Sequence, residues 1–122
     1  MTFFAGKLAE LSKKRSPLCL GLDPSREVFA EWGLKDDTEG LRRFCGVMME
    51  AAADRVAVFK PQSGFFERFG PPGLSEMASV VAAIRDQGSL SIIDCKRGDV
   101  SGTMEGYAEA SSARTAASAA TP

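Results

Sequence analysis

The residues best suited to chemistry in this 122-residue chain are Asp94, Lys96 and Asp99, which follow an apolar run. Side chains two positions apart in an extended chain point to the same face and start roughly 6–7 Å apart. Asp94 and Lys96 are therefore expected on one face, with Cys95 facing away. Adjacent carboxylates would keep the lysine protonated in a partly desolvated pocket. They could also hold a negative charge where an anionic substrate group must lie.

Two more ionisable residues, Asp23 and Lys60, stand at the ends of two other apolar runs. The carboxyl ends of parallel strands meet at one edge of a sheet, where ligands bind. We therefore expect Asp23, Lys60 and Asp94 to gather at one edge. Packing alone does not require three charges at one edge. A cluster of salt bridges that only ties the strand ends together is the alternative interpretation.

The chain contains no histidine, which excludes Ser-His and Cys-His nucleophile pairs and histidine-based metal sites. Any general acid or base must then be Lys, Asp, Glu, Tyr or Cys. The chain has three cysteines, an odd number, and they lack the spacing of a metal site: Cys19, Cys45 and Cys95. We expect them to be reduced and mostly buried.

The composition is that of an ordinary globular protein, with 44% apolar and 25% charged residues. A net charge of −1 gives no electrostatic footprint for nucleic acid. No apolar run approaches the ~18 residues that span a membrane, and residues 1–7 lack the features of a secretory signal. These observations predict a cytoplasmic protein with neither a nucleic-acid partner nor a membrane partner.

Three apolar runs are predicted to be the strands that position these charges: residues 18–22, 55–59 and 89–93. The first is expected to be buried on both faces. Gly98 would permit a sharp turn after the third strand, and a last helix would begin near Thr103.

Helices are predicted between the strands, and one precedes the first strand. The first would be capped by Thr2 and run over about residues 3–14, and a loop containing Trp32 and Gly33 is expected before the second. The second would be capped by Asp37 or Thr38, with an apolar face formed by Leu41, Phe44, Cys45, Met48 and Ala52. After a loop at 62–72, the third would end at Gly88, with an apolar face formed by Leu74, Met77, Val81 and Ile84. Alternating strands and helices predict an α/β fold with a parallel sheet.

The segment Ile92-Ile93-Asp94-Cys95-Lys96-Arg97-Gly98-Asp99 resembles the active-site segment of orotidine 5'-phosphate decarboxylases, most closely their larger bacterial branch. Residues 18–25 are similar to the first-strand motif of that branch, and residues 59–67 to its second-strand motif. The resemblance covers about residues 1–109, the N-terminal part of the family's barrel. Residues 110–122 form an Ala/Ser/Thr-rich tail that is expected to be a frayed helix or disordered.

The resemblance implies a (β/α)8 barrel, of which this chain holds about three strand-helix units, working as a homodimer. The family converts orotidine 5'-phosphate to uridine 5'-phosphate and carbon dioxide in pyrimidine synthesis, without metal or organic cofactor. By position, Lys96 would protonate C6 of the pyrimidine, and Asp94 would lie beside the departing carboxylate. An ammonium stabilises and then protonates the carbanion-like centre that decarboxylation leaves.

The resemblance gives roles to the other charged residues as well. Lys60 would complete the charge network and touch the ribose, and Asp23 would bind a ribose hydroxyl. Asp99 and Thr103 would reach into the partner subunit's site. Cys95 stands where alanine is usual in the family, and it would face away from the substrate.

A complete barrel of this kind needs about 250 residues. The 122-residue chain is therefore expected to be inactive or nearly so by itself.

Two other functions stay open. One alternative is a magnesium-dependent sugar-phosphate lyase or synthase of the same superfamily, which carries an acidic residue where Lys60 stands. The other is a non-catalytic fragment that only associates, with itself or with a complementary half.

Overall fold

A three-stranded parallel sheet carries the candidate site. In the computed structural model, which describes residues 3–52 and 54–111, the strands are β1 (Cys19–Leu22), β2 (Val58–Pro61) and β3 (Leu90–Ser91). They lie in the order β1-β2-β3, with Cys19 opposite Val58 and Phe59 opposite Ser91. One further parallel bridge joins Gln62 to Asp94 beyond the ends of β2 and β3. The parallel sheet predicted from the sequence is confirmed as a partial barrel.

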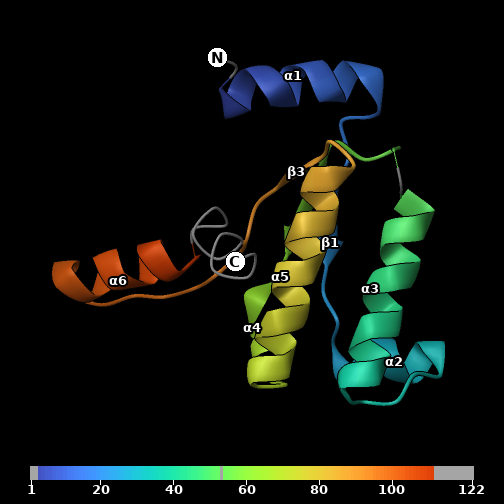
Figure 1. Cartoon of the computed structure of the whole chain (residues 1–122), viewed down its shortest axis with the longest axis vertical. Helices are drawn as coiled ribbons and strands as arrows, with labels where there is room; N and C mark the ends of the chain where they lie inside the picture. Colours follow the sequence, from blue (N-terminus) through green and yellow to red (C-terminus); the bar gives the residue numbers. More distant parts are fainter. Residues whose placement is uncertain (1–2, 53, 112–122) are drawn as a thin grey trace.

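Six helices accompany the sheet over the described residues. Helices α3 and α5 lie along it and contact each other, α1 lies beyond the end of the sheet at which its strands begin, and α6 stands apart (Figure 1). Their bounds are α1 (Phe4–Lys14), α2 (Arg26–Trp32), α3 (Thr38–Ala52), α4 (Ser63–Glu67), α5 (Pro71–Asp86) and α6 (Ser101–Ser111). None of the helices in this part of the chain is long and apolar enough to cross a membrane.

The core lies between the sheet and the pair of α3 and α5. Phe59 of β2, Leu41 of α3 and Ile84 of α5 are each 0% exposed, and the single core cluster they share also contains Phe66 of α4. The predicted apolar face of α3 is confirmed: Leu41, Phe44, Cys45 and Ala52 are buried, and Met48 packs against them. This packing fixes β2, and with it the position of Lys60.

Helix α3 begins as the sequence predicted, because the Asp37 carboxylate accepts a hydrogen bond from the backbone N–H of Gly40 at 2.8 Å. Gly40 is also a point of close approach, since a β-carbon there would lie 1.9 Å from the carbonyl oxygen of Lys35. The first helix predicted over about residues 3–14 is confirmed as α1 (Phe4–Lys14), but the predicted capping residue was wrong. Its N-cap is Phe3, without a side-chain hydrogen bond, and Thr2 lies outside the described residues.

Two short helices occupy segments expected to be loops. In α2, Ser25 Oγ accepts from the N–H of Val28 at 3.2 Å, and Gly33 ends the helix with φ 70°. Helix α4 lies within the expected loop at 62–72. Helix α5 then begins at Pro71, ahead of the expected start, and Leu74 is 46% exposed, outside the core face expected for it.

The strands also differ in detail from their predicted form. β1 has only β2 as a neighbour among the described residues, so Cys19 is exposed and Leu18 is 52% exposed. The expectations of a first strand buried on both faces and of mostly buried cysteines were therefore wrong, and only Cys45 is fully buried. β2 begins three residues later than expected and includes Lys60.

The chain after Asp94 follows an extended course to α6. Gly98 has no positive φ, and no turn is assigned between Cys95 and Val100, so the sharp turn expected at Gly98 is absent from this segment. Helix α6 begins at Ser101, near the position predicted, and has no buried residue. It continues to Ser111, past the start of the expected tail, and residues 112–122 lie outside the described part.

Candidate active site

Alternation along β2 turns Lys60 away from the core. Phe59 and Pro61, on either side of it, are fully buried against the helices. Because successive side chains of a strand point to opposite faces, the Lys60 side chain lies on the other face, where it is 43% exposed. That face is the one on which Asp94, from the neighbouring chain segment, presents its carboxylate.

Two lysines hold the carboxylate of Asp94 between them. Lys96 Nζ lies 2.8 Å from Asp94 Oδ1, and Lys60 Nζ lies 3.5 Å from Asp94 Oδ2. The Asp94 side chain is only 22% exposed, whereas that of Lys96 is 74% exposed. The carboxylate is thus the most enclosed charge of the three, and one ammonium remains open to a ligand.

The two ammonium groups keep Asp94 ionised. The hydrogen bond from Lys96 is the main cause that lowers the pKa of Asp94 below its usual range, and Lys60 acts in the same direction. Partial burial opposes this effect. The site therefore holds an ionised carboxylate between two lysine side chains. Such an arrangement could disfavour an anionic substrate group and donate a proton.

We expect the substitution Lys96→Met to raise the pKa of Asp94, because it removes the largest cause of the lowering. The pKa of Asp94 is lower in the folded state than in the unfolded state. Its ionised carboxylate therefore stabilises the fold at a pH above the unfolded-state pKa, and this contribution is lost as the pH falls through the folded-state pKa. Carboxyl-carbon NMR titration measures the shift. Asp36, whose pKa is lowered mainly by Arg68, is the internal control and should not move. An unchanged Asp94 titration in Lys96→Met would contradict the expected coupling.

The remaining predicted site residues do not join this cluster. Asp23 is exposed at the end of β1 and forms no ion pair among the described residues. Asp99 is exposed, and its Oδ1 accepts the N–H of Val100 at 2.7 Å. Thr103 is exposed on α6. The structure thus brings together Lys60, Asp94 and Lys96, whereas Asp23, Asp99 and Thr103 lie outside this cluster.

Sequence reasoning missed Gln62, whose Oε1 accepts a hydrogen bond from Lys96 Nζ at 3.3 Å. Its signal was its position, two residues after Lys60, which places both side chains on one face of an extended chain. It also missed an ion pair between Glu67 of α4 and Arg97. These two residues are 30 positions apart, so local spacing gives no sign of the contact.

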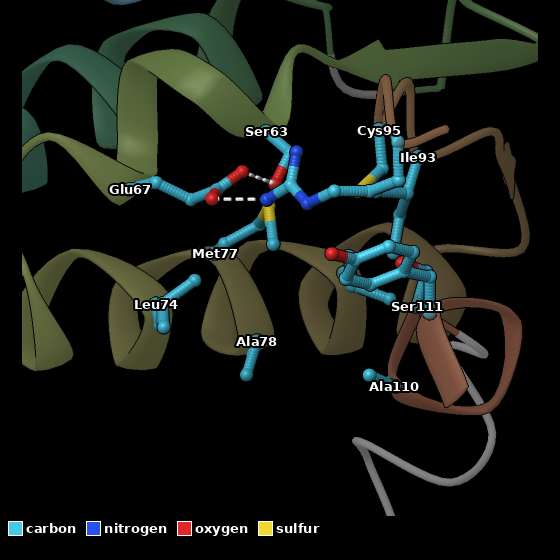
Figure 2. A pocket seen from close by; sticks show the side chains of 12 residues that line it. Ser63, Glu67, Leu74, Met77, Ala78, Ile93, Cys95, Ala110 and Ser111 are labelled. Carbon is cyan, nitrogen blue, oxygen red and sulfur yellow. Dashed lines mark hydrogen bonds and ion pairs between the residues drawn. The ribbon is translucent and has the colours of Figure 1, made fainter. Parts of the chain in front are cut away.

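Two cavities lie near the end of β3, and only one borders the charged cluster. A cavity of about 420 Å³ lies between α5, α6 and the chain after β3, and it is lined mostly by apolar side chains such as Met77, Val81 and Ile93 (Figure 2). It touches neither Asp94 nor Lys96. A second, of about 550 Å³, is lined by Gln62, Gly64, Phe65, Arg68, Lys96 and Arg97. The second is the better candidate for substrate, because the open lysine faces it.

Comparison with known proteins agrees with the family resemblance seen in the sequence. Residues 16–121 match the model of the orotidine 5'-phosphate decarboxylase / HUMPS family. Over 106 residues the chain is 49% identical to an orotidine 5'-phosphate decarboxylase of Myxococcus xanthus, covering 87% of this chain and 37% of that protein. It is 50% identical to the enzyme of the same name from Streptomyces coelicolor, covering 87% and 38%.

The solved structures agree with the sequence matches. A crystal structure from Streptomyces avermitilis, assigned as an orotidine 5'-phosphate decarboxylase, superposes with a TM-score of 0.84 at 47% identity, covering 90% of this chain and 39% of that one. The structure of Leishmania donovani UMP synthase superposes with a TM-score of 0.76 at 29% identity, covering 96% and 24%. The chain spans well under half the length of the relatives it matches, corresponding to their N-terminal part.

Proposed function

The chain belongs to the orotidine 5'-phosphate decarboxylase / HUMPS family, and from that premise we propose that it supplies the catalytic strand of an orotidine 5'-phosphate decarboxylase. The observation that carries the proposal is the contact of Asp94 with Lys96 at 2.8 Å and with Lys60 at 3.5 Å. A carboxylate fixed by two ammonium groups, one of them open to a cavity, suits decarboxylation without a cofactor.

In the proposed mechanism Asp94 stays ionised and disfavours the substrate carboxylate by like-charge contact. The bond from C6 of the pyrimidine to the carboxylate breaks, carbon dioxide leaves, and the electron pair remains on C6. Lys96 stabilises this developing charge and transfers a proton from Nζ to C6. Gln62, which accepts from the same Nζ at 3.3 Å, helps to direct the proton donor.

The proposed substrate contacts extend beyond this cluster. Lys60 would touch the ribose as well as Asp94, and the exposed Asp23 would bind a ribose hydroxyl. We propose that the enzyme acts as a homodimer in which Asp99 and Thr103 enter the partner subunit's site. The exposure of both side chains is compatible with this role.

We expect the 122-residue polypeptide alone to have little or no activity. Phosphate sites in such barrels usually lie after strands seven and eight, and the described residues supply three strands. Binding energy from a remote phosphate supports stabilisation of the transition state at the reacting ring. A polypeptide without that contact should therefore turn over poorly even with Asp94 and Lys96 in place.

A chimera tests the proposed function. Residues 1–109 of this chain would replace the matching N-terminal part of the Streptomyces coelicolor relative, which is 50% identical over the matched region. We expect the folded, purified chimera to convert orotidine 5'-phosphate to uridine 5'-phosphate, measured by loss of substrate absorbance, equally well with and without a chelator. A folded chimera without turnover would overturn the proposal. Activity that requires added magnesium would instead favour the sugar-phosphate alternative.

A further inference from the structure

The chain segment that carries Lys96 lies beyond the regular pairing of the sheet. β3 ends at Ser91, and the last parallel bridge on this side joins Asp94 to Gln62. The Lys96 side chain is 74% exposed, and its hydrogen bonds go to the side chains of Asp94 and Gln62. Among the described residues, strand pairing therefore ends two positions before Lys96 and does not reach its backbone.

Helix α4 holds this segment on both sides of Lys96. Before it, the N–H of Ser63 donates to the carbonyl oxygen of Asp94 at 3.0 Å. After it, the Arg97 guanidinium forms an ion pair with Glu67. Ser63 Oγ in turn donates to the other carboxylate oxygen of Glu67 at 2.7 Å, and Ser63 is 3% exposed (Figure 2). A buried hydroxyl thus orients the carboxylate that holds Arg97.

The guanidinium also touches the backbone of Lys96 itself. Arg97 Nη1 donates to the carbonyl oxygen of Lys96 at 3.0 Å. The Cζ atom of the Arg97 guanidinium lies 5.9 Å from the centroid of the Tyr107 ring on α6. The side chains of Arg97 and Glu67 are only 33% and 31% exposed. Partial withdrawal from water strengthens their attraction relative to a fully exposed pair. A hydrogen bond between two ionised groups is also stronger than one between neutral groups.

We propose that Ser63, Glu67 and Arg97 form a clamp that positions Lys96 against Asp94. The proposal rests on the proposed function, since it assigns the clamp to the same proton donor. The clamp contacts neither charged group of the Asp94–Lys96 pair, so its members are positioning residues. A misplacement of about 1 Å can cost about 100-fold in rate. We expect a rate loss of this size when Lys96 is no longer held in position.

Backbone relaxation measurements on the 122-residue chain test the clamp without any activity. We expect Arg97→Ala to lower the NMR order parameters of the Lys96 and Arg97 amides from about 0.85 toward 0.6 or less, while β2 stays rigid. Arg42→Ala is the matched control, because Arg42 pairs with Glu39 on the surface at 2.8 Å. Order parameters at Lys96 that do not change in Arg97→Ala would overturn the proposal.

Kinetics of the chimera test the positioning role. We expect Arg97→Ala to lower kcat about 100-fold with a much smaller change in KM, and Arg97→Lys to restore part of kcat by pairing with Glu67. Glu67→Gln should resemble Arg97→Ala. Unchanged kcat, or a loss that falls on KM alone, would contradict positioning. If the unsubstituted chimera is inactive, the proposed function fails, and the relaxation measurement still decides whether the clamp orders Lys96.

Discussion

Replacing Lys96 by alanine is expected to lower the kcat of the chimera about 10⁴-fold, the upper range for loss of a positioned proton donor. The substitution removes the group proposed to protonate C6, and it also removes the 2.8 Å contact that holds Asp94. The negative charge of Asp94 would remain, held by Lys60 at 3.5 Å. The variant would therefore keep the Asp94 carboxylate, which is proposed to disfavour the substrate carboxylate. It would lose the Lys96 ammonium, which is proposed to stabilise the carbanion-like centre at C6.

The measurement is single-turnover formation of uridine 5'-phosphate by the folded variant, with circular dichroism as the test of folding. Lys13→Ala is the matched control, because Lys13 is an exposed lysine in the last turn of α1, far along the chain from the site. It should leave kcat unchanged. A Lys96→Ala chimera that keeps a tenth or more of the parent rate would show that another group donates the proton.

The charged cluster was predictable because it depends on local geometry. Asp94 and Lys96 share a face through the two-residue period of extended chain, and their contact follows directly. Lys60 required one further step, the rule that parallel strands end at a common edge. The parallel order β1-β2-β3 bears out that step. The same rule did not bring Asp23 to Asp94, because β1 and β3 lie on opposite sides of β2.

The clamp was not predictable, because Glu67 and Arg97 are 30 positions apart in the sequence. Their ion pair joins helix α4 to the segment between β3 and α6, and local spacing does not reveal such a contact. Helix α2 was missed for a different reason. It has only seven residues, too few for a clear apolar period, although Ser25 and Gly33 are ordinary capping residues. Leu74 shows a third limit: an apolar residue at helical spacing can lie outside the core, here with 46% exposure at the edge of the cavity between α5 and α6.

Substituting Phe59 by alanine is expected to destabilise the 122-residue chain by about 3–5 kcal/mol. Phe59 is 0% exposed in β2, the central strand, and belongs to the core cluster that joins the sheet to α3 and α5. A domain of ordinary stability unfolds with about 5–15 kcal/mol, so this one change would remove a large share of it. Urea denaturation followed by circular dichroism measures the free energy of unfolding.

Phe3→Ala is the matched control, because it removes the same atoms from a side chain that is 74% exposed. Its effect should stay within about 0.5 kcal/mol. Equal losses in the two variants would mean that β2 is not the centre of the folded core. The expected difference also bears on the site, since Phe59 immediately precedes Lys60. Packing of Phe59 on one face of β2 holds Lys60 on the other face. If the core unfolds, Lys60 should therefore lose its contact with Asp94.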